Sequence, residues 1–166
     1  MCGSCGCWAN PMREEHRALD SQKAALEAVL EGPSGPRSRN VMLFLMLRSF
    51  APRLETHLRK EEEALFPAIQ RLLGTESGPL VLLRDQHEQL RAYLNELAEL
   101  LQVPEAACWE RLESAGKALV DLLEDHEEKE GRFFIDLLAS SLEPQELMGL
   151  ARQFQQAACR CGEEET

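Results

Sequence analysis

The sequence is poor in several features that would assign it to particular classes of protein. Aromatic residues make up 5% of its 166 residues, with a single tyrosine, so residues suited to β-strands are scarce. Basic residues are also few: there are 18 against 29 acidic ones, and the formal charge of −11 would repel a phosphate backbone. These shortages argue against a β-rich fold and against nucleic acid as a partner.

Long apolar runs and targeting signals are missing as well. The most apolar stretch, residues 41–47, ends at Arg48 and is far shorter than the roughly 20 residues that cross a bilayer. The first twelve residues lack the basic start and long apolar segment of a signal peptide. We therefore expect a soluble, cytoplasmic protein that does not bind membranes. At 166 residues the chain is long enough for one domain with a continuous core.

Apolar residues recur in steps of three and four along the sequence, which predicts amphipathic helices. Four segments share this spacing: residues 12–30, 43–72, 80–101 and 109–137. Turn-forming residues separate them, for example Gly-Pro-Ser-Gly-Pro at 32–36. One apolar face per helix and short connections predict an all-α fold, an antiparallel up-down-up-down four-helix bundle with a short fifth C-terminal helix.

This pattern divides the chain into three parts. We expect a cysteine-rich N-terminal tail over residues 1–11, the bundle over 12–138, and an accessory helix with a cysteine-rich and acidic tail over 139–166. Pro52 lies inside the second helical segment, which predicts a kink or a new helix start near Ser49. The strict spacing of the fourth segment places Phe133 on the buried face.

The polar residues that interrupt the apolar faces include every histidine of the sequence. His16, His57, His87 and His126 supply one histidine to each expected long helix. Two glutamates also interrupt the faces, each four residues after a histidine and therefore on the same side of its helix. These two motifs are His57-Leu-Arg-Lys-Glu61 and His126-Glu-Glu-Lys-Glu130, and equivalent residues are 69 positions apart in both cases.

Two carboxylates inside a bundle need compensation. An unpaired buried charge costs several kcal/mol or more, which is comparable with the stability of a whole domain. Neutral imidazoles do not supply the missing charge, but a pair of metal ions does, and a donor set of imidazole and carboxylate suits iron, manganese or zinc. Bundles hold two-metal centres through His and Glu side chains on facing helices. The spacing therefore predicts a di-metal site.

Two interpretations without metal also have to be weighed. A lone histidine on an apolar face is more often a packed core residue than a ligand, and a buried polar layer can fix helix register. Neither accounts for four histidines on four helices together with the repeated His-x-x-x-Glu spacing. A metal-free interaction bundle predicts that His57→Ala leaves the stability nearly unchanged or raises it.

These motifs resemble the hemerythrin-like HHE cation-binding family. The resemblance spans roughly residues 12–138 and rests on four elements in order: Glu15-His16, His57-x-x-x-Glu61 followed by Glu62-Glu63-Ala64-Leu65-Phe66-Pro67, His87-Glu88, and His126-x-x-x-Glu130. It implies a four-helix bundle that holds two non-haem iron ions and reacts with dioxygen. It also implies that the four histidines are terminal iron ligands and that Glu61 and Glu130 bridge the two ions.

One position departs from the family pattern. Many members have another histidine four residues after the third one, where this sequence has Arg91. The family's oxygen carriers use five histidines, so a centre with four would leave both ions an open position in a six-coordinate shell. Asp20 and Glu127 lie close in sequence to His16 and His126 and are candidates for one further ligand. A centre open at both ions favours redox chemistry, iron handling or sensing over reversible oxygen transport.

Five of the six cysteines lie near the ends of the sequence: Cys2, Cys5, Cys7, Cys159 and Cys161. Their spacing permits a second metal or an iron–sulfur cluster, a redox or disulfide pair, or free thiols, and the sequence does not decide among these. Cys108, beside Trp109, is expected to be a small packed residue.

The sequence therefore predicts a hemerythrin-like di-iron protein whose ligand is dioxygen, another small diatomic molecule or peroxide. Its expected role is the sensing, storage or handling of oxygen, redox state or iron. An alternative is a di-iron oxidoreductase of the peroxidase or iron–sulfur repair type, so enzymatic activity stays open. The sequence does not indicate whether the protein has a protein partner.

Overall fold

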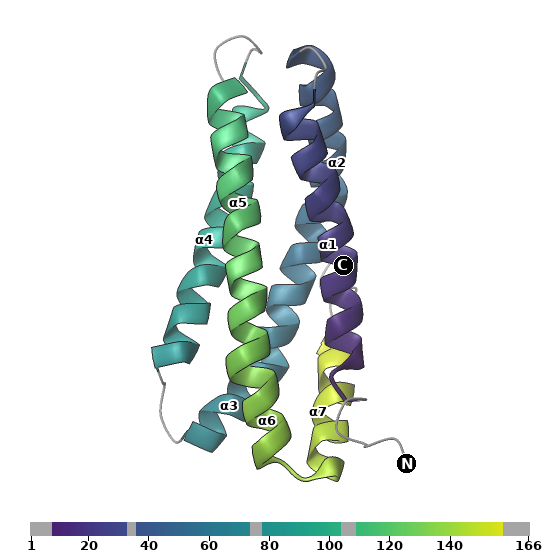
Figure 1. Cartoon of the computed structure of the whole chain (residues 1–166), viewed down its shortest axis with the longest axis vertical. Helices are drawn as coiled ribbons and strands as arrows, with labels where there is room; N and C mark the ends of the chain where they lie inside the picture. The colour runs from purple at the N-terminus through teal and green to yellow at the C-terminus, as the bar shows by residue number, and fades with distance from the viewer. Residues whose placement is uncertain (1–7, 33–35, 74–77, 104–108, 158–166) are drawn as a thin grey trace, which may run out of the picture.

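The computed structural model describes residues 8–32, 36–73, 78–103 and 109–157, and every regular element in these ranges is helical. Four long helices form the bundle: α1 (Asn10–Glu31), α2 (Pro36–Lys60), α4 (Gly78–Leu100) and α5 (Trp109–Glu130). They run alternately up and down along the long axis of the molecule (Figure 1). The antiparallel up-down-up-down bundle is therefore confirmed. None of the described helices is long and apolar enough to cross a membrane.

Shorter helices close one end of the bundle. α3 (Phe66–Leu73) follows α2, α6 (Asp136–Ser141) follows α5, and α7 (Pro144–Ala157) folds back against α1 and α2 at the same end (Figure 1). α7 buries one face there, through Leu147, Leu150 and Phe154. The expected fifth C-terminal helix is thus confirmed as α7.

Two π-helical turns occupy matching places in the two halves of the bundle. η1 (Glu61–Leu65) joins α2 to α3, and η2 (Gly131–Ile135) joins α5 to α6. A π turn holds more residues than an α turn, so the side chains after it face a different direction. Phe133 is consequently 48% exposed, whereas Phe134 is 1% exposed and lies in the core. The prediction that Phe133 is buried is wrong, because it assumed a regular α-helix through this segment.

α2 is continuous from Pro36 to Lys60, with Pro52 inside it. Pro52 has no amide hydrogen to donate to the preceding turn, which costs the helix one hydrogen bond. Helix geometry nevertheless continues on both sides, and the Ser49 hydroxyl donates within the helix to the carbonyl of Met46 at 2.9 Å. α2 therefore has no new start near Ser49, and the alternative expectation of a kink there stays a prediction.

The apolar core consists of two clusters. The upper cluster draws buried residues from all four long helices, including Leu19, Leu54, Leu90 and Leu123. The base cluster lies around α3, α6 and α7 and includes Met12, Ala64, Leu83, Phe134 and Phe154. On every long helix, the histidine lies along the chain between a residue of the upper cluster and a residue of the base cluster. The fold thus places the four histidines in one layer between two apolar regions.

Candidate metal centre

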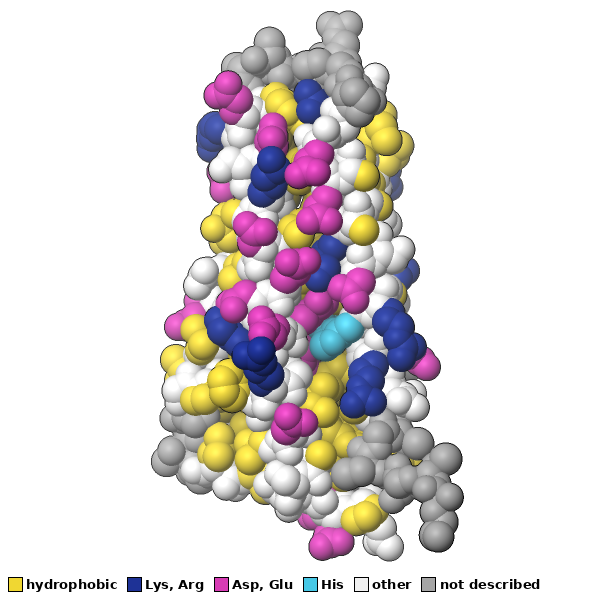
Figure 2. Space-filling model, in the orientation of Figure 1, with side chains coloured by type: hydrophobic (Ala, Val, Ile, Leu, Met, Phe, Trp, Pro, Cys, Tyr) yellow, Lys and Arg dark blue, Asp and Glu magenta, His cyan; other side chains and the backbone are white. Residues whose placement is uncertain are grey.

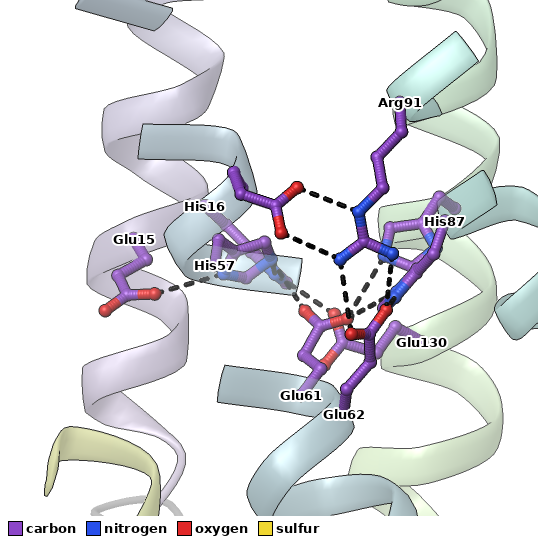
Figure 3. Close-up of polar contacts among 10 residues, drawn as sticks. Glu15, His16, His57, Glu61, Glu62, His87, Arg91 and Glu130 are labelled. Atoms are coloured by element: carbon purple, nitrogen blue, oxygen red, sulfur yellow. Dashed lines mark hydrogen bonds and ion pairs between the residues drawn. The ribbon is translucent and has the colours of Figure 1, made fainter. Parts of the chain in front are cut away.

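The four predicted histidines and the two predicted glutamates meet in the layer between the two clusters. Each histidine comes from a different long helix, while Glu61 begins η1 and Glu130 ends α5 (Figure 3). Three histidines and both glutamates are at most 1% exposed, whereas the His16 side chain is 15% exposed. A histidine is accordingly visible among charged side chains on the face shown in Figure 2.

The donor atoms of these residues form two groups that share one glutamate. The first group contains His16, His57, Glu61 and Glu130, and the second contains Glu61, His87 and His126. Within each group the donor atoms lie within 4.8 Å of one another, so each group is compact enough to surround one ion. Glu61 is the residue that joins the two groups.

Glu61 faces three imidazole rings from three helices. Its Oε1 lies 2.7 Å from His57 Nε2, and its Oε2 lies 3.1 Å from His87 Nε2 and 3.3 Å from His126 Nε2. Glu130 has a less central place, since its Oε2 lies 3.0 Å from one ring nitrogen, His16 Nε2. The two predicted glutamates are therefore equivalent in sequence spacing but differ in their surroundings.

Several donor atoms of the centre lack a hydrogen-bond partner within the described residues. Both oxygens of Glu130 and both ring nitrogens of His126 are buried without one. The Nε2 atoms of His16 and His57 face each other at 3.1 Å. Buried carboxylates and converging imidazole nitrogens are favourable when a cation lies between them. The residues present thus fit metal ions of the iron type.

The outer nitrogens of two histidines are held by carboxylates that sequence reasoning did not single out. His57 Nδ1 donates to Glu15 Oε2 at 3.1 Å, and His87 Nδ1 donates to Glu62 Oε1 at 2.7 Å. This arrangement directs the Nε2 lone pair of each ring inward, which is the form in which imidazole binds metal. The signal in the sequence was weak: Glu15 precedes a histidine and Glu62 follows Glu61, but both reach rings on other helices.

Each of these carboxylates is paired with a cation. Glu15 forms an ion pair with Lys60, and Glu62 binds Arg91 through Nη1 at 2.8 Å and Nη2 at 3.2 Å. Arg91 also binds Glu55, with both distances at or below 3.0 Å. Arg91 belongs to neither donor group and lies beside His87, with its guanidinium group against the carboxylate of Glu62 (Figure 3).

Attraction between the buried groups outweighs the effect of burial on their ionisation. Burial favours the uncharged forms, but the charge of Glu61 raises the pKa of His57 well above its ordinary value, and the charge of His57 lowers the pKa of Glu61 well below its own. Against burial, hydrogen bonds to Glu61 and Glu62 raise the pKa of His87. Hydrogen bonds from His87 and Arg91 likewise overcome burial and lower the pKa of Glu62 to about 2. Without metal, the centre is thus held by ion pairs.

The two acidic residues considered as further ligands lie away from the donor groups. Asp20 and Glu127 each have a carboxylate oxygen 2.9 Å from Nζ of Lys23, a buried lysine of α1. Neither residue belongs to the two donor groups. The structure assigns both carboxylates to Lys23.

All six cysteines lie outside the described residues. The second metal or cluster suggested for Cys2, Cys5, Cys7, Cys159 and Cys161, and the packed position suggested for Cys108, therefore stay predictions.

Comparison with known proteins agrees with the fold and the site. The hemerythrin HHE cation binding domain matches residues 9–138 and, in a second match, residues 78–161, which begins at the start of α4. No solved structure gives a significant match.

The curated relatives of this chain include proteins named iron-sulfur cluster repair protein YtfE. The one from Yersinia pestis (strain Pestoides F) is 34% identical over 101 residues, which is 57% of this chain and 44% of that protein. The one from Yersinia pseudotuberculosis serotype O:1b (strain IP 31758) is 33% identical over 99 residues, or 55% of this chain and 43% of that protein. The chain thus spans less than half the length of these relatives. Since the family match covers most of its length, the chain belongs to the hemerythrin HHE cation-binding domain family.

Proposed function

We propose that this chain is a non-haem di-iron protein that binds dioxygen or a related small oxidant, such as another diatomic molecule or peroxide. His16 and His57 are the terminal ligands of one ion, His87 and His126 are those of the other, and Glu61 and Glu130 bridge the two. The proposed role is the sensing, storage or handling of oxygen, redox state or iron.

One observation carries this proposal: Glu61 is fully buried and lies within 3.3 Å of three imidazole nitrogens from three different helices. A glutamate used only for structure would need one cationic partner rather than several converging ring nitrogens. The two oxygens of Glu61 point toward different donor groups, which is the position that a carboxylate bridging two ions takes. The unpartnered oxygens of Glu130 support the same interpretation.

Two ferrous ions at these positions would supply electrons for the reduction of a small oxidant. The protein's own contribution is to fix the imidazole rings and to limit access of water. Glu15 and Glu62 orient two of the rings, while the upper and base clusters exclude solvent from both sides of the layer. The partly exposed edge at His16 is the least shielded part of the ligand set.

A second candidate function is a di-iron oxidoreductase that takes part in the repair of iron–sulfur clusters. The names of the Yersinia relatives favour it. We place it second because the match covers 44% of the Yersinia pestis protein, so more than half of that protein has no counterpart in the match.

Metal analysis of protein purified without oxygen tests the proposal. We expect two iron ions per chain, and we expect the double variant Glu61→Ala/Glu130→Ala to lose them while it stays helical by circular dichroism. Glu63→Gln is the matched control, since Glu63 is an exposed neighbour of Glu61 that pairs with Arg59. Less than about one-tenth of a metal ion per chain after reconstitution with iron would exclude the di-iron site.

An optical spectrum recorded before and after admission of air separates the two functions. Absorption bands that form in air and disappear under vacuum indicate reversible binding. Continued consumption of peroxide over many turnovers, with an added reductant, indicates an oxidoreductase. Assignment of the protein to iron–sulfur repair further requires that it restore the activity of an enzyme whose iron–sulfur cluster has been damaged.

A further inference from the structure

Arg91 occupies the place of a family histidine, and its contacts show what it does instead. The guanidinium group lies between two carboxylates of the α2–η1 segment, Glu55 and Glu62, which are seven residues apart and so about two helical turns apart (Figure 3). It makes four contacts with them at 2.8–3.2 Å. The planar guanidinium group of arginine can donate two hydrogen bonds to each of two carboxylates, whereas the ammonium group of a lysine does not have this geometry.

The same carboxylate that Arg91 binds also holds a ring of the metal centre. Glu62 Oε1 accepts from His87 Nδ1 at 2.7 Å and from Arg91 Nη1 at 2.8 Å. His87 and Arg91 are both on α4, one helical turn apart, so the carboxylate from η1 bridges two residues of the facing helix. Movement of Glu62 would release the outer nitrogen of His87.

We propose that Arg91 is a positioning residue for the second iron position: by fixing Glu62, it orients His87 and so sets the affinity of the ion held by His87 and His126. Where many family members have a further histidine, this chain has an arginine that fixes the orientation of a ligand, His87, through Glu62. This inference rests on the proposed di-iron function.

Fixing the orientation of a ring should affect iron affinity most at the second position, which is formed by His87 and His126. In the structure, its donor group contains three residues with one carboxylate, Glu61, whereas the first group contains four with two carboxylates, the proposed second bridge Glu130 among them. With fewer donors and less negative charge already in place, the second position depends more on the orientation of each ring. At the first position, the ring of His57 is held by a different pair, Glu15 and Lys60. This pair lines a groove of about 740 Å³ between α1 and α2.

Anaerobic titration with ferrous iron, monitored by competition with a chelator, tests this inference. For the unaltered protein we expect two binding steps, and His87→Ala should remove the weaker one. Glu62→Gln should weaken the weaker step about 10- to 100-fold, which is the effect of removing a partner of a metal-bound histidine, and Arg91→Gln should weaken it by up to that amount. The stronger step should change little. Arg91→Lys should restore only part of the loss, because it keeps the charge but not the planar geometry.

A double-variant cycle shows whether Arg91 acts through Glu62. If it does, Arg91→Gln combined with Glu62→Gln should weaken the second step no more than Glu62→Gln alone. Arg111→Gln is the matched control, since it removes an exposed arginine–glutamate pair with Glu96 far along the bundle. Its two binding steps should equal those of the unaltered protein.

The possible failures are distinguishable. If the unaltered protein binds no iron, the proposed function itself is wrong. If the unaltered protein binds two ions and Arg91→Gln binds them with the same affinities, the positioning role of Arg91 is wrong while the di-iron site stands. Equal weakening of both steps, accompanied by a lower melting temperature of the metal-free protein, also contradicts the inference, because it indicates a general structural role for Arg91.

Discussion

The two halves of the bundle have the same ligand spacing and different surroundings. In the first half, His57 and Glu61 are four residues apart, and in the second half His126 and Glu130 repeat that spacing. Glu61 nevertheless faces three imidazole rings, whereas Glu130 faces one and has no hydrogen bond to either oxygen. The chain thus repeats a motif without repeating its environment.

The difference shows that a ligand's role depends on what surrounds it, not on its spacing alone. Helix geometry places both glutamates one turn after a histidine, in the same layer of the bundle. Which rings each carboxylate meets depends on the packing of the four helices and on residues outside the motif. We expect the two halves to respond differently when equivalent residues are changed.

The largest expected difference concerns metal content. Glu61→Ala removes the residue shared by both donor groups and should abolish most iron binding at both positions. Glu130→Ala removes the other proposed bridge, which the structure groups with the first position alone, and should therefore retain more iron than Glu61→Ala. Iron per chain measured by elemental analysis distinguishes the two variants. Equal loss in both would show that the two glutamates are equivalent and that the asymmetry does not govern binding.

A difference in size is expected for the stability of the metal-free protein. Glu61→Gln leaves the raised-pKa ring of His57 without its main counter-charge and should cost about 3–5 kcal/mol of unfolding free energy. Glu130 faces one ring, His16 at 3.0 Å, instead of three, so Glu130→Gln should cost less, about 1–2 kcal/mol. Urea unfolding at pH 7 with a chelator present measures both. A larger loss for Glu130→Gln would contradict the comparison.

The π turns provide a test in which the two halves should agree. Phe66 follows η1 and Phe134 lies in η2, and both are at most 1% exposed in the base cluster. Replacement of either by alanine should cost about 3 kcal/mol, while Phe133→Ala should stay within about 0.5 kcal/mol. Thermal and urea unfolding provide the values. If Phe133→Ala were the costly change instead, the segment after Glu130 would be an ordinary α-helix.

The smallest effect is expected from the acidic residues beside the centre. Asp20→Asn and Glu127→Gln each remove a partner of Lys23, so iron content should stay at the value of the unaltered protein. A modest change in stability is expected because Lys23 keeps a second carboxylate in either variant. Loss of one iron ion in either variant would identify that residue as a ligand after all.

The sequence predicts the bundle and the composition of the centre well, for a physical reason. Periodic burial is a local property, so an apolar face interrupted by His57 and Glu61 already places both in the interior. The antiparallel course and the equal heights of the four histidines follow from short connections and similar segment lengths. These features need no knowledge of side-chain contacts between helices.

The contacts between helices could not be predicted in the same way. Glu15 binds a ring on α2, Glu62 binds a ring on α4, and Asp20 and Glu127 meet on Lys23. Each of these pairings depends on the rotation of one helix against another, which the order of residues along a single helix does not determine. The role of Arg91 stayed unpredicted for the same reason.

The position of the two π turns has a consequence for which insertions and deletions the chain tolerates. Each turn joins the layer of histidines to the base cluster, since Glu61 begins η1 and Phe134 of η2 belongs to that cluster, so the turn sets the angle between the two regions. A change of η2 to α geometry at constant length would rotate all that follows by about 100° about the helix axis. Phe134 would then leave the core while Glu130 kept its place. Loss of one residue together with that change would restore the orientation, because a π turn holds one residue more than an α turn. The chain should therefore tolerate the loss of one residue between Glu130 and Phe134 better than a further insertion there.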